Sequence, residues 1–413
     1  MNVIVQSLPN LRTVTVALVT RHGTSHDKLG GITRVLVPSL ARGTAFRSEE
    51  EIFTLVNGKG GEFLNIIEKD YTAIGLRVIP RETEMAFKLL FEMLAEPLLQ
   101  EHIIEIEKMN AIQRIEQVKA NPLYRMVIFE SEKPVFGDNH PISRPITGFP
   151  EEITRITREV VLEHLRTKFL VDPVVIILGN FDENTAEHFK STVQSLFEEK
   201  SLLVTGSPAS FPPVEVPPWN IHQAPQEMAS NAYLSLNFRV EPDKCSLTMI
   251  ELVSAIIGGS MGSRMYKLRD QTGLSYVFFS EGKMVGNTGA VKSIMDVGPE
   301  RLEEGVKALF GIINNLSDEE ISNTELYNNQ NYLAGKMDMN FDQPFQLLRV
   351  IINDLIHGGP RSFEDYYQEI TQITPKDLLK WFRGVWKPET ISLTAGGKFD
   401  REILEKNWED LHP

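Results

Sequence analysis

The pattern of apolar and polar residues divides the chain into two stretches that repeat the same order of elements. The first opens with strand-like segments that include Val14 to Val19, and the second opens with Ala232 to Val240. Each continues through a glycine-rich helix and a pair of strands into long helices. Each then closes with a strand, at Val174 to Leu178 and at Ile391 to Ala395. An internal repeat of roughly 200 residues that mixes strands with helix pairs predicts an α+β fold with two similar domains that face each other.

The composition changes between the two stretches. Glycine, serine and proline become frequent between about Lys200 and Pro225, with six prolines from Pro208 to Pro225. Such a composition favours extended backbone. We therefore expect a first domain at residues 1–199, an extended linker at 200–225 and a second domain at 226–413.

Charge and cysteine content exclude several classes of protein. A net charge of −14 argues against nucleic acid as a partner, because phosphate binding requires a basic surface. The single cysteine, Cys245, excludes an intrachain disulfide framework and a cysteine-rich zinc site. The sequence has no apolar run of about 18 residues, so we expect no membrane span. The chain starts directly with a strand-like segment, which predicts a cytoplasmic protein, or a periplasmic one if a leader has been trimmed.

The stretch from Gly258 to Tyr276 combines small residues, a short helix and a turn. Met265 and Leu268 have helical spacing, and Gly273 suits the left-handed residue that ends a helix. Strand formers follow, so Arg269 is expected near the helix end and Tyr276 at the start of a strand, side by side. The alternative is structural: Arg269 would cap the helix, where a cation is favourable, and Tyr276 would fill a core position.

Histidines are scattered along the chain without a recognised catalytic motif. His22 and His26 are four apart and could bind a metal on a helix, but Gly23 and the preceding strand favour a solvated turn. The pairs Glu163-His164 and Glu187-His188 belong to amphipathic helices, where we expect exposed surface pairs. The sequence contains no His-Glu-x-x-His, His-x-x-Glu-His, Gly-x-Ser-x-Gly or Walker motif.

The run from Gly258 to Tyr276 resembles the second-half signature of the pitrilysin-type zinc peptidases, the inverted-motif group that includes insulin-degrading enzyme and the mitochondrial processing peptidase. Members have a glycine-rich stretch, then Ser-Arg, then an Arg and a Tyr seven apart around a Gly-Leu pair. The resemblance implies two pitrilysin-like domains, each with a mixed, mostly antiparallel sheet packed with helices, around a clam-like chamber. In that family the Arg and Tyr reach across the chamber and hold the substrate carbonyl at the zinc site, and Arg269 and Tyr276 fall on those places.

The first half resembles the family's zinc-binding helix in its frame but not in its chemistry. The family pattern is Gly-x-x-His-x-x-Glu-His-x-x-x-x-Gly-Thr, and its ends match Gly31 and Gly43-Thr44. The two histidine positions and the glutamate position are replaced, and the family's remaining ligand, a glutamate further along, is replaced too; the residues found there are Arg34, Pro38, Val37 and Arg114. Arginine has no lone pair to give a metal, and Pro38 is expected to kink the helix. We therefore expect no metal and no cofactor in this chain.

This combination implies the zinc-free subunit of a two-subunit bacterial metallopeptidase. The expected partner is a homologous subunit that bears the His-x-x-Glu-His motif and holds the zinc, while Arg269 and Tyr276 bind the peptide substrate and stabilise the oxyanion. The chain would then be inactive alone, and a homodimer is possible in isolation. The alternative is a non-proteolytic scaffold or peptide-binding subunit that resembles the core proteins of respiratory complexes. A third reading, an independent peptidase with an unrecognised site, would require zinc-dependent activity of the chain alone.

Overall fold

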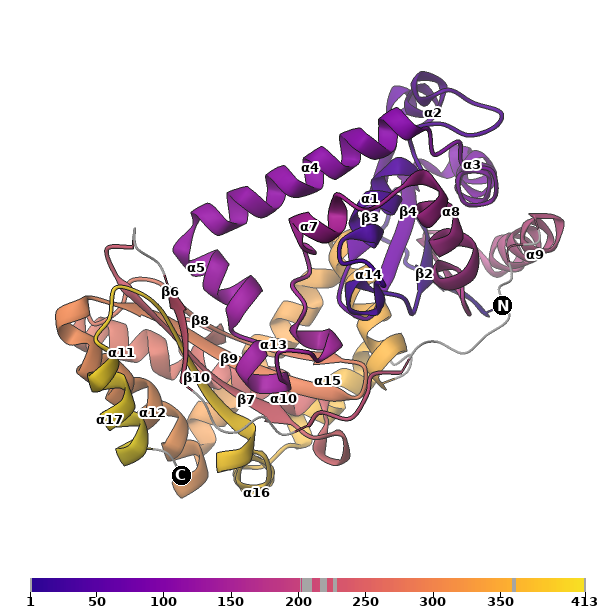
Figure 1. Ribbon diagram of the computed structural model, residues 1–413. Helices are drawn as coiled ribbons and strands as arrows, with labels where there is room; N and C mark the ends of the chain where they lie inside the picture. The colour runs from indigo at the N-terminus through magenta and orange to yellow at the C-terminus, as the bar shows by residue number, and fades with distance from the viewer. Residues whose placement is uncertain are drawn as a thin grey trace. The chain divides into compact units, whose positions relative to one another are not determined.

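The computed structural model describes residues 2–200, 202, 210–215, 221–225, 229–358 and 362–411. The chain forms two compact units, which we call the first unit and the second unit. The first unit contains Met1–Gln117, Pro145–Phe211 and Asn340–Ile356, and the second contains Val118–Arg144, Pro212–Met339 and His357–Pro413. Each unit has one five-stranded mixed sheet with helices packed on it, which confirms the predicted α+β class (Figure 1).

The sheet of the first unit has the strand order β1-β5-β2-β4-β3. At one edge β1 (Asn2–Ser7) runs parallel to β5 (Val174–Gly179). The other pairs are antiparallel: β5 with β2 (Val14–Thr20), β2 with β4 (Thr72–Val78) and β4 with β3 (Glu62–Ile67). All residues of β2 and β5 are buried, and for β5 the continuous apolar sequence predicts this burial.

The sheet of the second unit repeats this topology, with the order β6-β10-β7-β9-β8. Its parallel edge pair is β6 (Ile221–Pro225) with β10 (Ile391–Gly397). The antiparallel part continues through β7 (Ala232–Val240), β9 (Thr288–Val297) and β8 (Phe278–Val285). Residues 201, 203–209 and 216–220 of the expected linker lie outside the described residues, but its last five residues form β6. A proline at the edge of a sheet is compatible with such a strand.

The helices have the following bounds. The first unit contains α1 (Ile32–Ser39), α2 (Glu49–Val56), α3 (Thr83–Ala95), α7 (Pro150–Ile153), α8 (Arg158–His164), α9 (Glu183–Lys200) and α14 (Pro344–Asn353). The second contains α5 (Pro122–Arg125), α6 (Lys133–Phe136), α10 (Leu247–Ser254), α11 (Arg264–Thr272), α12 (Leu302–Asp318), α15 (Phe363–Gln372), α16 (Pro375–Val385) and α17 (Arg401–Leu411). Two of the boundaries between the units, after Gln117 and after Met339, fall within α4 (Glu101–Ala120) and α13 (Asn323–Phe341).

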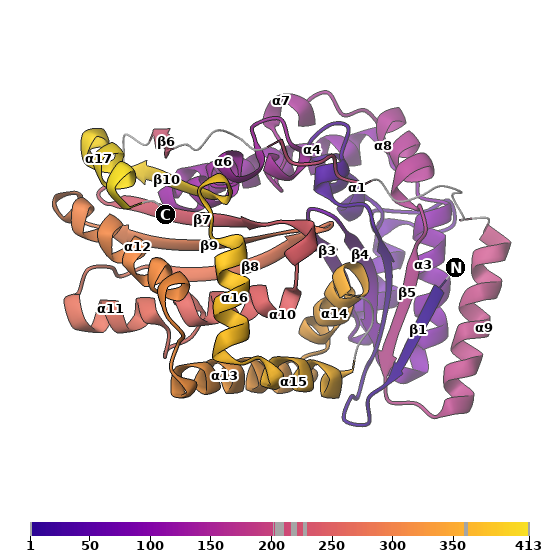
Figure 2. The ribbon, with the colours of Figure 1, turned by 90° about the horizontal axis from the view of Figure 1, so that it is seen from below.

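In each unit, one helix that packs on the sheet comes from the half of the sequence that does not supply the strands of that sheet. In the first unit, α3 and α9 contact β2 and β1, while α14 packs on β5 (Figure 2). Leu347, Leu348 and Ile352 of α14 join Ile176 and Leu178 in one buried apolar cluster. In the second unit, α12 and α16 contact β7, and α6, which precedes the expected linker, contacts β7 and β10. The two halves of the sequence are therefore interleaved in the folded chain. Among the described helices, none combines the length and hydropathy needed to cross a bilayer.

Candidate functional site

The helix α1 carries three of the four positions that the family uses for zinc chemistry. It begins after Gly31, whose φ of +101° is accessible to glycine but strained for other residues. The apolar side chains of Ile32, Val35 and Leu36 are buried, as their spacing predicts. Pro38 lies in the last turn, and α1 ends at Ser39 directly after it. A proline at this place has no N–H to donate to the carbonyl of residue 34, and the helix nevertheless continues through it to Ser39.

Arg34 links α1 to two other segments of the first unit. Its Nε donates a hydrogen bond to the carbonyl oxygen of Ile146 at 3.1 Å, and its Nη2 donates to that of Ile67 at 3.4 Å. Burial lowers the pKa of Arg34, and the nearby carboxylates of Glu68 and Asp27 act against that shift. Arg34 therefore makes charge-assisted hydrogen bonds where the family pattern has a zinc ligand.

The residues at the four family positions do not fit zinc. Val37 is buried and has no donor atom for a metal. Arg114, on α4, is close enough to Arg34 for its positive charge to lower the pKa of Arg34 further. A guanidinium group offers only N–H donors and repels a divalent cation. The expectation that these four positions hold no metal thus agrees with their chemistry.

Arg269 lies in the last turn of α11, as predicted. Ser263 caps the start of this helix by accepting a hydrogen bond from the backbone N–H of Tyr266, and Gly273 ends it in the left-handed conformation. The Arg269 guanidinium carbon lies 4.2 Å from the centroid of the Tyr266 ring and 5.6 Å from that of Phe278. Its Nη2 donates to Asp270 Oδ1 at 3.0 Å, and this bond raises the pKa of Arg269. Two aromatic rings and one carboxylate therefore hold the guanidinium in place.

Tyr276 lies in the loop between α11 and β8, with 86% of its surface exposed. This exposure contradicts the alternative in which Tyr276 fills a core position. The prediction that Tyr276 starts a strand is also wrong, because β8 begins at Phe278. The backbone N–H groups of Tyr276 and Val277 both donate to Asp296 Oδ1, at 2.9 and 2.8 Å. The Asp296 side chain therefore holds the turn that precedes β8.

Two residues that the sequence did not suggest fix this loop. Asp296, at the end of β9, is buried, and its Oδ1 accepts a third hydrogen bond from Ser275 Oγ at 2.9 Å. Its Oδ2 accepts from Asn231 Nδ2 at 3.0 Å. Arg301 Nη1 donates to the carbonyl oxygens of Thr272 and Gly273, at 3.4 and 3.3 Å. A carboxylate in a fully buried strand is unusual, and that signal could have marked Asp296 in the sequence.

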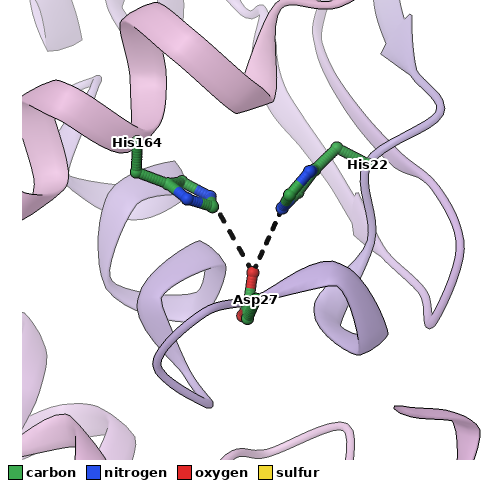
Figure 3. A group of neighbouring side chains, drawn as sticks. All are labelled: His22, Asp27 and His164. Atoms are coloured by element: carbon green, nitrogen blue, oxygen red, sulfur yellow. Dashed lines mark hydrogen bonds and ion pairs between the residues drawn. The ribbon is translucent and has the colours of Figure 1, made fainter. Parts of the chain in front are cut away.

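A second group of polar side chains gathers in the first unit, at His22, Asp27 and His164 (Figure 3). All three residues are buried, which corrects the expectation of a solvated turn for His22 and of an exposed position for His164. His22 Nε2 lies 3.3 Å and His164 Nε2 3.8 Å from Asp27 Oδ1. Burial lowers the pKa of His164 to about 4, while the charge of Asp27 acts in the opposite direction. His164 faces inward because α8 packs against α1. No sequence spacing links it to His22.

Two family models match the chain. The model described as "Insulinase (Peptidase family M16)" matches residues 2–146, and the one described as "Peptidase M16 inactive domain" matches residues 156–333. An uncharacterized zinc protease from Streptomyces coelicolor is 23% identical, over 92% of this chain and 83% of its own length.

Solved structures share the fold. The crystal structure of a peptidase M16 inactive domain from Pseudomonas fluorescens has a TM-score of 0.83 at 20% identity and covers 95% of both chains. A chain of complex III2 from Candida albicans has a TM-score of 0.78 at 16% identity, covering 99% of this chain and 97% of that one. The matches extend over both halves of the sequence, as the resemblance of the run from Gly258 to Tyr276 predicts. The chain therefore belongs to the M16 (insulinase) peptidase family, with residues at the family's zinc positions that are unsuited to binding zinc.

Proposed function

We propose that this chain is the subunit of a heteromeric M16 peptidase that has no catalytic zinc, and that it supplies Arg269 and Tyr276 to a substrate bound at a partner's zinc site. The observation that carries the proposal is the combination of an exposed Tyr276 ring and a loop that is held on both sides. Asp296 binds the backbone at Tyr276 and Arg301 binds it at Gly273, so the phenol is presented to solvent from a fixed backbone. Functional side chains are often found on loops that a rigid scaffold positions.

The groups of this chain would act on the substrate carbonyl. In the partner, zinc would polarise the scissile carbonyl and make a bound water nucleophilic. Tyr276 would donate its hydroxyl proton in a hydrogen bond to the oxyanion that develops on that carbonyl. Asp270 engages the Nε–Nη2 edge of the Arg269 guanidinium, and the Nη1–Nη2 edge of the planar fork would donate to the adjacent substrate backbone.

The test is reconstitution with the homologous chain that bears the His-x-x-Glu-His motif, followed by an assay with a fluorogenic peptide. Losing one oxyanion donor typically costs about 2.7–4 kcal/mol of transition-state stabilisation. Tyr276→Phe and Arg269→Ala should each lower the turnover of the assembled complex by roughly 100-fold or more. Tyr327→Phe is the matched control, because Tyr327 is also exposed in the second unit, and its turnover should not change. Unchanged turnover in the Tyr276 and Arg269 variants of an intact complex would refute the assigned roles.

A second candidate is a scaffold subunit that holds a peptide or a partner without cleaving it. The fold similarity to a chain of the Candida albicans complex III2, over nearly the whole length of both chains, favours this candidate. In that case the reconstituted complex would form and bind peptide, but it would not cleave it. The Tyr276 and Arg269 variants would then change the affinity for the peptide, and there would be no turnover for them to change.

A further inference from the structure

We propose that His22, Asp27 and His164 form a binding site for a divalent transition-metal ion, with Zn²⁺ as the expected occupant. This site is built from residues other than the family's zinc positions at Arg34, Val37, Pro38 and Arg114. Two imidazole nitrogens and one carboxylate oxygen are a ligand set typical of zinc and of other late first-row metals.

The distances in the cluster are close to those of a metal coordination shell. A tetrahedral ion with bonds of about 2.0–2.1 Å keeps its ligand atoms about 3.3 Å apart. His22 Nε2 and Asp27 Oδ1 are 3.3 Å apart, and His164 Nε2 and Asp27 Oδ1 are 3.8 Å apart. The three ligand atoms all lie within 4.8 Å of one another, and both rings direct a nitrogen toward the same carboxylate oxygen (Figure 3). Small side-chain movements would therefore place all three around one ion.

Hydrogen bonding alone provides only distant partners for His164 Nε2. Asp27 Oδ1 already accepts a short bond of 2.6 Å from Thr33 Oγ1. His164 Nε2 is 3.5 Å from Thr33 Oγ1 and 3.8 Å from Asp27 Oδ1, and both separations exceed those of ordinary hydrogen bonds. An ion among the three residues would provide the buried His164 nitrogen with a close partner.

Neighbouring groups orient the carboxylate that would bind the ion. Thr33 holds both carboxylate oxygens of Asp27, through its hydroxyl and through its backbone N–H at 3.3 Å from Oδ2. The turn between His22 and Asp27 also contains the buried hydroxyls of Thr24 and Ser25, which have no hydrogen-bond partner within the described part of the chain. Buried hydroxyls of this kind often have an ordered water as their partner, and a water is also the usual fourth ligand of an ion held by three side chains.

The position of the cluster suggests a structural role. His22 follows β2, Asp27 precedes α1 and His164 is the last residue of α8. An ion at this place would cross-link the turn that contains His22 and Asp27 to the end of α8, a segment far along the chain. The family pattern places two zinc ligands on the helix that corresponds to α1, whereas the proposed ion would anchor the start of α1 through a different set of residues.

Metal binding by the chain alone provides the test, and peptidase activity is not needed. The purified chain is stripped with a chelator, and Zn²⁺ is then titrated calorimetrically, with Co²⁺ as a spectroscopic probe of tetrahedral coordination. We expect one equivalent to bind, a rise in melting temperature, and an affinity at least 10–100-fold lower for His22→Gln and Asp27→Asn. His188→Gln is the matched control, because His188 is an exposed histidine of the same unit, and it should bind as the unchanged chain does.

Two results would overturn the proposal. One is a failure of the unchanged chain to bind Zn²⁺ or Co²⁺. The other is an affinity in His22→Gln and Asp27→Asn equal to that of the His188→Gln control. If a variant does not fold, the unchanged chain still tests the proposal. Its titration shows whether one ion binds, and its Co²⁺ spectrum shows whether the ion has tetrahedral coordination with nitrogen ligands.

Discussion

The loop that presents Tyr276 should depend on one buried carboxylate, that of Asp296. Its Oδ1 accepts hydrogen bonds from the backbone of Tyr276 and Val277 and from the side chain of Ser275, at 2.8–2.9 Å. In Asp296→Asn the acceptor is neutral, and the new amide group faces the Nδ2 donor of Asn231, with which it cannot form the present bond. The substitution therefore weakens three bonds and disrupts a fourth without a change in side-chain size.

The expected cost follows from the difference between charged and neutral hydrogen bonds. Bonds to charged groups contribute about 1.5–3 kcal/mol each and neutral ones about 0.5–1.5 kcal/mol, while removal of the buried charge recovers part of the difference. We expect a net loss of about 2 kcal/mol, concentrated in the loop. A loss of that size raises the rate of local opening, and hence of amide hydrogen exchange at Tyr276 and Val277, by roughly 30-fold.

Hydrogen exchange followed by mass spectrometry or NMR measures this effect. Amides of β2 in the first unit should keep their protection. Asp270→Asn is the matched control, because Asp270 bonds the Arg269 side chain, and it should leave the exchange of Tyr276 and Val277 unchanged. Unchanged protection of these two amides in Asp296→Asn, or an equal loss over the whole chain, would refute the reasoning. In the reconstituted peptidase, Asp296→Asn should lower kcat more than it raises KM, because it leaves the Tyr276 hydroxyl in place on the chain but moves it away from the developing oxyanion.

Three further predictions concern other parts of the chain. Arg34→Met removes the two hydrogen bonds from α1 to backbone carbonyls and should lower the free energy of unfolding in urea by about 1–3 kcal/mol; an unchanged midpoint would contradict that role. Thr374→Ala removes the capping box with Asp377 at the start of α16 and should cost about 1 kcal/mol, seen as a lower melting temperature. Burial raises the pKa of Cys245 to about 12, so its alkylation at pH 8 should be roughly 100-fold slower than in the unfolded chain and should rise with pH up to that value. Equal rates in the folded and unfolded chain would show that the thiol is not shielded.

The strands were the part of the fold that the sequence predicted best. A continuous apolar run identifies β5, because strands buried on both faces contain few polar residues. In β7 the apolar residues alternate with Ser235, Asn237 and Arg239, and this period of two identifies the strand. The proline-rich composition hid β6, whose strand conformation depends on pairing with β10, a segment far along the chain. The amphipathic pattern of α14 predicts a buried face but not the sheet that buries it. That sheet belongs to the first unit, and no local signal encodes such a long-range contact.

The candidate sites show the same limit. The helical spacing and Gly273 placed Arg269 correctly in the last turn of α11. The start of β8 was misplaced by two residues because the backbone before it bonds to Asp296, a side chain from a neighbouring strand. His164 was expected on the surface because an isolated helix pattern cannot identify the helix that packs against it. In each case the error arose where a side chain from elsewhere in the sequence determines the local structure.

The two halves differ in what holds their corresponding segments, and this difference bears on the choice between a peptidase subunit and a scaffold. In the first half, Arg34 stands at a zinc position of the family and donates hydrogen bonds to two backbone carbonyls, so a role in stability is enough to account for it. In the second half, a buried carboxylate is used to fix a loop whose most prominent side chain, Tyr276, is exposed and adds little to the core. Burying a carboxylate is unfavourable unless its bonds are well made, and a scaffold would need only a stable turn at this place. A fixed loop with an exposed phenol is what an oxyanion donor requires, and it favours the peptidase subunit.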